Sequence, residues 1–312
     1  MMPFWGLLRR KRPATPTTPA RAPQPQAQPR SAEQERAPRF ERRYLEDVPY
    51  LLPKDEAEID RLNFQHYALM SVQKVHIVAP LERYPQAILD VGCGTGLWAR
   101  EVGHRFPACR VVGVDVEPPE RLPTTPVNVQ FIYSDVLKGL PFDDNAFDLV
   151  HQRLLISAIP ARSWPAVVRE LVRVTRPGGW LQLTETGGYY HRPGPLSLRV
   201  SGLLDRAFER WGFDPYIAEH LPMYLQQAGA VDVEKYVYSV VLGEGGGQGG
   251  RLLQKDLLAL LHALSERMAS LIAREEWQRM LEALPAEWAA YQTAFQFHVT
   301  VGRKPGAPQA GR

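Results

Sequence analysis

The chain has little cysteine and no long hydrophobic run. Its 312 residues include two cysteines, Cys93 and Cys109, which are too few for a disulfide framework and fit a reducing compartment such as the cytoplasm. No apolar stretch approaches the roughly 20 residues that a membrane helix needs. Near the N-terminus the apolar residues precede the basic ones, which is the reverse of a secretory signal. We therefore expect a cytoplasmic protein without a membrane span.

Neither cysteine has a metal-ligand spacing, and the histidines show none either, so the sequence predicts no metal site. The net charge of +3 is unevenly distributed. Residues 1–43 hold ten basic and three acidic residues, or +7, which leaves −4 for the remainder. A nucleic-acid surface should make the folded part basic, so this distribution argues against nucleic acid as a partner.

Composition divides the chain into three parts. Residues 1–43 are rich in proline and arginine and have too little apolar surface to fold, so we expect a disordered basic tail. Residues 44–305 carry alternating apolar and polar segments typical of one folded domain, and residues 306–312 read as a second disordered tail. A weak attraction of the basic tail to anionic lipid or RNA stays open.

Short apolar runs alternate with helical patterns through the folded part. The expected strands are 87–91, 110–115, 129–133, 147–151, 180–185, 231–242 and 294–301. Repeated strand–helix units predict a doubly wound α/β fold, a Rossmann-like, mostly parallel sheet of seven strands with helices on both faces. We expect residues 250–285 to form a helical insertion before the last strand. This insertion is either a lid hinged on the glycine-rich run 243–250, or a fixed helical layer or dimer face.

A glycine-rich stretch, LDVGCGTGLWAR, follows the first strand. A dinucleotide loop needs G-x-G-x-x-G, but the third position counted from Gly92 is Leu97. A phosphate loop needs a Gly-Lys pair, which the stretch lacks. Asp90 beside the glycines would repel phosphate and suits a ligand with a cationic centre and an ammonium group.

Acidic residues also end the next two strands. Asp115 lies 19 residues beyond Gly96, where a carboxylate can accept hydrogen bonds from ribose hydroxyls, and Asp135 follows the third strand. Parallel sheets bind ligands at the carboxyl ends of their strands. These acids and the glycine loop therefore predict a nucleoside-binding site at one edge of the sheet.

The motifs ILDVGCGTG, SDVLKGLPFDDNAFDLV and ELVRVTRPGGWLQL, in this order, resemble those of class I S-adenosylmethionine-dependent methyltransferases. The segments FDLVHQRLL, SWPAVVRELVRVTRPGGWLQL and VGRKP are similar to the LaeA-like group, known from fungal secondary metabolism. Gln182 stands where that group often has glutamate, and Cys93 where threonine is more usual.

The resemblance implies that S-adenosylmethionine is the cofactor. The residues that it implies for cofactor binding are Asp90, Gly92, Cys93, Gly94, Gly96, Asp115, Val116, Asp135, Val136 and His151. In this arrangement the glycine loop and Asp90 approach the methionine part. Asp115 holds the ribose, and Asp135 with the amide of Val136 holds the adenine.

Two residues at strand ends are catalytic candidates. His151 ends the fourth strand and could act as a general base, or it could have a structural or cofactor-contacting role. Glu185 ends the fifth strand and could orient the acceptor or only form hydrogen bonds. His66 and Tyr67 could close over the cofactor or pack as ordinary helix residues. The aromatic and histidine residues 189–191 could line an acceptor pocket or pack on the next helix.

We expect a methyltransferase that acts on a small-molecule acceptor, as a monomer or homodimer. The alternative is a cofactor-binding regulatory protein that works through protein partners. A nucleic-acid methyltransferase is disfavoured because the N/D-P-P-[YFW] motif is absent and His151-Gln152-Arg153 follows the fourth strand instead. A dehydrogenase is disfavoured by the glycine spacing.

Overall fold

The computed structural model describes residues 43–45, 48–186 and 190–306. Apart from Arg43, the expected N-terminal tail lies outside the described residues, as do Tyr189 and the chain beyond residue 306. Within the described part, no helix is both long enough and apolar enough to cross a membrane.

The described residues form a sheet of eight strands. The strands are β1 (Ala87–Val91), β2 (Arg110–Asp115), β3 (Val129–Tyr133), β4 (Phe147–Arg153), β5 (Thr175–Glu185), β6 (Tyr190–His191), β7 (Val231–Val241) and β8 (Ala294–Arg303). Their order is β3-β2-β1-β4-β5-β8-β6, with β7 paired to β8. The first five strands run parallel, and β8 is antiparallel to β5, β6 and β7.

The doubly wound, mostly parallel fold is confirmed, but the expected count of seven strands is too low. The additional strand is β6, whose two residues pair with Phe295 and Ala294. Strands β1 and β2 are buried on both sides along almost their whole length. This explains why they read as continuous apolar runs.

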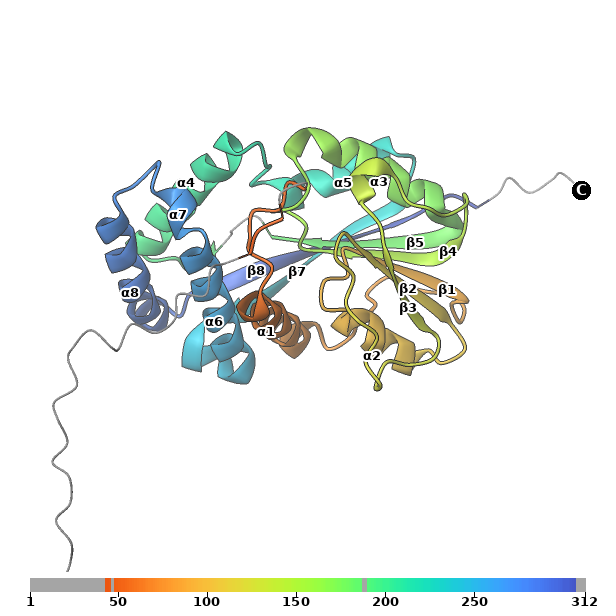
Figure 1. Ribbon diagram of the computed structural model, residues 1–312, viewed down its shortest axis with the longest axis horizontal. Coiled ribbons are helices and arrows are strands. Elements are labelled where there is room, and N and C mark those ends of the chain that lie inside the picture. The colour runs from red at the N-terminus through yellow and green to blue at the C-terminus, as the bar shows by residue number, and fades with distance from the viewer. Residues whose placement is uncertain (1–42, 46–47, 187–189, 307–312) are drawn as a thin grey trace, which may run out of the picture. The chain divides into compact units, whose positions relative to one another are not determined.

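Helices cover both faces of the sheet (Figure 1). They are α1 (Glu56–Gln73), α2 (Leu97–Arg105), α3 (Trp164–Val174), α4 (Pro195–Arg210), α5 (Ile217–Gln227), α6 (Gly247–Ala263), α7 (Ser265–Met268) and α8 (Arg274–Tyr291), with 3-10 turns η1 (Val136–Lys138), η2 (Ala161–Ser163) and η3 (Gly243–Gly246). Helices α3 and α5 lie above the sheet and α2 below it (Figure 1). Helix α1 begins at the cap Asp55, whose carboxylate accepts the amide of Glu58.

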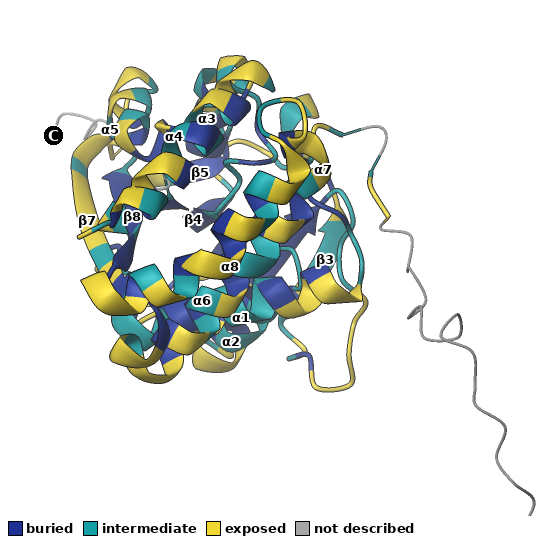
Figure 2. Ribbon diagram, turned by 90° about the vertical axis from the view of Figure 1, so that its left-hand side faces the viewer, coloured by how far each residue is buried: buried dark blue, intermediate teal, exposed yellow. Residues whose placement is uncertain are grey.

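The helical insertion between β7 and β8 packs on α1 and α4 around Trp277 and Trp288. In Figure 2 its helices turn exposed residues outward and buried residues inward. Its glycine-rich start is tightly packed, because a side chain at Gly249 would collide with Ser71 and one at Gly250 with the carbonyl of Val241. The expected lid motion remains a prediction.

Candidate functional site

A pocket opens at the carboxyl ends of β1 to β4. Most of the sequence-predicted binding residues line it: Asp90, Gly92, Cys93, Gly94, Asp115, Val116, Asp135, Val136 and His151. Gly96 and Glu185 are not among its lining residues in the described part of the chain. The parallel strands thus bring most of the expected site together.

The loop between β1 and α2 needs glycine at two positions, because each combines a positive φ with a close neighbour. Gly92 has φ +67°, and a Cβ there would lie 2.5 Å from the Leu155 side chain at the pocket wall. Gly96 is the N-cap of α2 and has φ +70°, and a Cβ there would lie 2.5 Å from the ring of Phe131. Positive φ costs other residues free energy, so a glycine at these positions lets the loop turn sharply and pack closely. Gly96 therefore supports the loop although it does not line the pocket.

The Asp115 carboxylate holds the glycine loop from the end of β2. Its Oδ2 accepts the amide of Gly94 at 2.9 Å, and its Oδ1 accepts the amide of Glu117 at 3.0 Å. The Lys54 ammonium lies 3.6 Å from Oδ1. A carboxylate has about four lone-pair sites, so Asp115 keeps acceptor capacity for a ligand hydroxyl.

Asp135 occupies the corresponding position after β3. Its Oδ1 accepts the amide of Leu137 at 3.0 Å and so caps η1. The Lys138 ammonium lies 3.1 Å from Oδ2. Asp135 and Val136 both line the pocket, so the geometry is compatible with the adenine contact that the resemblance implies.

Asp90 and His151 lie side by side on paired strands β1 and β4. The Nδ1 of His151 is 2.8 Å from Asp90 Oδ1, and its ring stacks on Trp98 at a centroid distance of 3.7 Å. Burial lowers the pKa of His151, while Asp90 partly offsets this. The ring is therefore neutral near pH 7, and its Nδ1–H donates to Asp90.

The second oxygen of Asp90, Oδ2, is buried and accepts no hydrogen bond within the described residues. Because Asp90 lines the pocket, this oxygen can accept a donor from a ligand. Burial and the nearby Asp90 raise the pKa of the Cys93 thiol, which therefore stays protonated.

Glu185 lies at the end of β5, but it faces the backbone after β4. Its carboxylate accepts the side-chain amide of Gln152 at 2.5 Å and the backbone amides of Leu155 and Ile156 at 2.7 and 3.2 Å. Burial raises the pKa of Glu185 to about 8, although these hydrogen bonds lower it. The contacts show Glu185 holding the loop that carries the pocket residue Leu155.

The segment before α1 and one face of α1 close the pocket, but not through His66 or Tyr67, the two residues that the sequence suggested for this role. Tyr50, Lys54, Leu62 and Gln65 are among the lining residues. Leu51 anchors the segment, because its amide donates to the carbonyl of Ser157 in the loop after β4. The sequence thus indicated that this helix could cover the site, but not which of its residues face the pocket.

The other aromatic and histidine candidates lie elsewhere. Tyr67 is exposed, whereas His66 is buried and 2.9 Å from Glu101. Tyr190 packs against Trp288 and Phe295. Tyr189 lies outside the described residues, and His191 is exposed. None of the described candidates lines the pocket.

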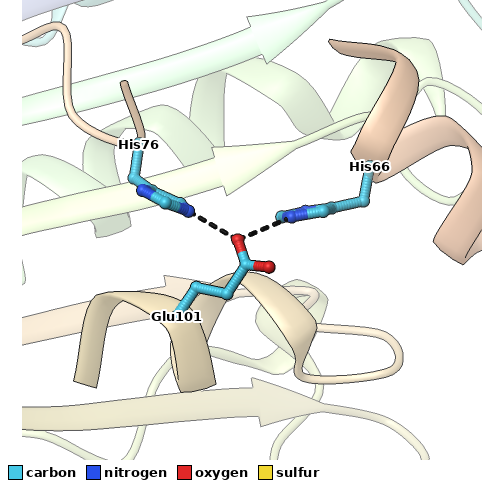
Figure 3. Close-up of side chains that lie close together, drawn as sticks. All are labelled: His66, His76 and Glu101. Carbon is cyan, nitrogen blue, oxygen red and sulfur yellow. Dashed lines mark hydrogen bonds and ion pairs between the residues drawn. The ribbon is translucent and has the colours of Figure 1, made fainter. Parts of the chain in front are cut away.

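Arg153, the last residue of β4, also lines the pocket. The sequence had placed it after the fourth strand without a role. Its guanidinium lies 3.1 Å from His66 Nδ1. His66, His76 and Glu101 form a cluster with ligand-type atoms within 4.8 Å of one another (Figure 3). Sequence spacing gave no sign of this cluster.

Comparison with known proteins identifies relatives of the chain. A family model for a methyltransferase domain matches residues 88–179, which include the glycine loop and the acidic strand ends. Methyltransferase pytC of Aspergillus terreus is 32% identical over 203 residues, and the match covers 62% of this chain and 61% of that protein. The chain therefore spans about six tenths of that relative.

Two further relatives carry different kinds of name. Methyltransferase str3 of Strobilurus tenacellus is 31% identical over 200 residues, covering 60% of this chain and 69% of that protein. The secondary metabolism regulator laeA of Coprinopsis cinerea is 36% identical over 143 residues, covering 44% of this chain and 35% of that protein. Together with the motifs in the pocket, these matches confirm the resemblance: the chain belongs to the class I S-adenosylmethionine-dependent methyltransferases, in their LaeA-like group.

Proposed function

We propose that the protein transfers a methyl group from S-adenosylmethionine to a small-molecule acceptor. The observation that carries this proposal is the set of three acidic strand ends, Asp90, Asp115 and Asp135, in one pocket. The free Asp90 Oδ2 suits an ammonium, and Asp115 suits ribose hydroxyls. The residues present therefore fit the cofactor that the family uses.

When bound, the cofactor supplies a sulfonium methyl group, and the protein has to supply alignment and electrostatics. Alignment alone can lower a barrier by roughly 7–11 kcal/mol. In this site the glycine loop is fixed by Asp115 and packed against Leu155. Such a rigid loop favours one orientation of the bound ligand.

Binding of S-adenosylhomocysteine to the full chain tests the proposal. We expect micromolar affinity by titration calorimetry. Asp115→Ala should weaken it about 10- to 100-fold, because hydrogen bonds to a charged group contribute about 1.5–3 kcal/mol. Asp232→Ala is a matched control, since Asp232 is a half-exposed surface acid that pairs with Arg303. If the wild-type chain does not bind the ligand, the proposal is wrong. If Asp115→Ala binds it as tightly as the wild type, Asp115 does not hold the ribose.

The roles of His151 and Glu185 in catalysis are part of the proposal. His151 is neutral and lines the pocket, which supports a role as general base. If it is the base, His151→Ala should lower turnover about 100-fold or more and weaken cofactor binding far less. Equal losses in both measurements would make it a binding residue. Glu185 would act indirectly, through the loop at Leu155.

A second candidate function is regulation through protein partners, because the relatives include proteins named as secondary metabolism regulators. The distinguishing experiment is incubation of the protein with labelled S-adenosylmethionine and a cell extract, followed by mass spectrometry. A methylated small molecule supports the enzyme. Cofactor binding without any methylated product, together with a stable protein partner in a pull-down, supports the regulator.

A further inference from the structure

Four side chains from separate segments form a continuous hydrogen-bonded chain beside the pocket. Arg153 at the end of β4 contacts His66 of α1, which contacts Glu101 of α2. His76, in the loop after α1, contacts the same Glu101 oxygen at 2.6 Å. Figure 3 shows both imidazole rings directed at this carboxylate.

The direction of each hydrogen bond follows from Arg153. A guanidinium only donates, so His66 Nδ1 must accept, and the ring proton of His66 is on Nε2, which donates to Glu101. Burial lowers the pKa of His66, which agrees with a neutral ring. Burial raises the pKa of Glu101, but the hydrogen bonds from His66 and His76 outweigh it and bring the value to about 2. Glu101 is therefore ionised.

The far end of this chain is fixed by Gln182. Its Oε1 accepts the amides of Val78 and Ala79 at 2.6 and 3.2 Å, and its Nε2 donates to the carbonyl of His76 at 2.9 Å. An ionised glutamate has no donor for the His76 carbonyl. Glutamine at this position thus holds the loop that brings His76 to Glu101.

Arg153 brings a positive charge to a pocket that is also lined by Asp90, Asp115 and Asp135. In the described part of the chain its hydrogen bond goes to the neutral His66 ring, and Glu101 is reached only through that ring. The other pocket cation, Lys54, lies beside Asp115 instead. A guanidinium has five N–H donors, so Arg153 keeps donors for a ligand.

We propose that Arg153 binds the carboxylate of the amino-acid part of the cofactor, and that His66, Glu101 and His76 are positioning residues for it. Arg153 lies two residues after His151 on β4, so both side chains point to the same face of the strand. The Asp90 oxygen that His151 leaves free is on the neighbouring strand. The pocket thus offers an acceptor for the ammonium and a cation for the carboxylate of one amino acid. This inference rests on the proposed function.

The same cluster has the composition of a metal site, with two imidazoles and a carboxylate. A metal ion would need the lone pair of His66 Nε2, which carries the proton when Nδ1 accepts from Arg153. The hydrogen-bonded arrangement therefore opposes metal binding, and zinc is tested as the alternative.

The experiment compares two ligands by calorimetry on the full chain. S-adenosylhomocysteine has the carboxylate, and 5′-methylthioadenosine lacks the whole amino-acid part. We expect Arg153→Met to lower the affinity for S-adenosylhomocysteine about 10- to 100-fold, since charge-assisted hydrogen bonds are strong. The affinity for 5′-methylthioadenosine should be unchanged. Arg153→Lys should fall between, because it keeps the charge but loses the planar fork.

We expect His66→Ala to lower the affinity for S-adenosylhomocysteine, but by less than Arg153→Met does. Its affinity for 5′-methylthioadenosine should be unchanged. Binding of 5′-methylthioadenosine also shows that each variant is folded. If Arg153→Met weakens both ligands equally, or neither, the inference is wrong. Zinc binding to the wild-type chain that is lost in His76→Ala would also overturn it. A wild-type chain that binds neither ligand would instead contradict the proposed function.

Discussion

Arg61 of α1 is buried and Arg153 at the end of β4 is half-buried, and the two guanidinium groups have different partners. Arg61 contacts carboxylates directly: both Glu58 oxygens and one Asp256 oxygen lie 2.7 Å from its nitrogens. Arg153 contacts the neutral ring of His66 and lines the pocket. One guanidinium is thus neutralised inside the protein, and the other is left able to pair with a ligand.

The Arg61 cluster connects α1 to the insertion, because Asp256 belongs to α6. Tyr50, which lines the pocket, donates its hydroxyl to Glu58 at 2.9 Å. Burial raises the pKa of Asp256 to about 6, although Arg61 lowers it. The comparison indicates that Arg61 stabilises the packing of α1 on α6, whereas Arg153 serves the site.

Replacing each arginine by methionine should separate these two roles. Arg61→Met leaves two buried carboxylates without their cation, and breaking such a buried pair costs about 3–5 kcal/mol. Arg153→Met removes one hydrogen bond to a neutral ring, which costs about 1 kcal/mol. Urea unfolding of both variants measures the difference.

Ligand binding should rank the two variants in the opposite order. At temperatures where Arg61→Met is folded, its affinity for S-adenosylhomocysteine should stay within a few-fold of the wild type, because Arg61 does not line the pocket. If Arg153→Met lowers the free energy of unfolding as much as Arg61→Met does, both arginines are structural. The proposed difference between their roles is then wrong.

The sequence was sufficient to locate the acidic end of the site. Asp90, Asp115 and Asp135 each follow an apolar run, and parallel strands end at the same edge of the sheet, so local pattern and topology together place them. Strand β6 was missed because its two residues are too few to show any periodicity.

The same argument places Arg153 at the end of the fourth strand, but it could not find the residues that hold Arg153. His66 and Glu101 are 35 positions apart, and Arg153 is 87 positions from His66. No local spacing connects such residues, because their contact depends on how α1 packs on α2 and β4. The position of Glu185 at the end of a strand also did not show where its side chain points. Its carboxylate accepts the amides of Leu155 and Ile156 instead of lining the pocket.

The contributions of Glu101 and Asp256 to the stability of the folded chain should change with pH in opposite directions. The pKa of Glu101 is lowered to about 2 in the folded chain, so its contribution to stability is present above the unfolded value near 4.5 and lost as the pH falls toward 2. Glu101→Gln should therefore cost about 1 kcal/mol at pH 7, after discounting for solvent screening of a partly exposed group. The difference from the wild type should shrink below about pH 4.5.

Asp256→Asn is the matched control from the other cluster. The folded pKa of Asp256 is raised to about 6, so its contribution to stability is largest at low pH and decreases as the pH rises from about 4 through 6. Relative to Asp256→Asn, the wild type should thus lose stability on raising the pH through this window. Urea unfolding at pH 3, 4, 5, 6 and 7 measures both differences. A pH-independent difference for Glu101→Gln would mean that its carboxylate charge does not stabilise the Arg153 cluster, and that Arg153 is held there by packing alone.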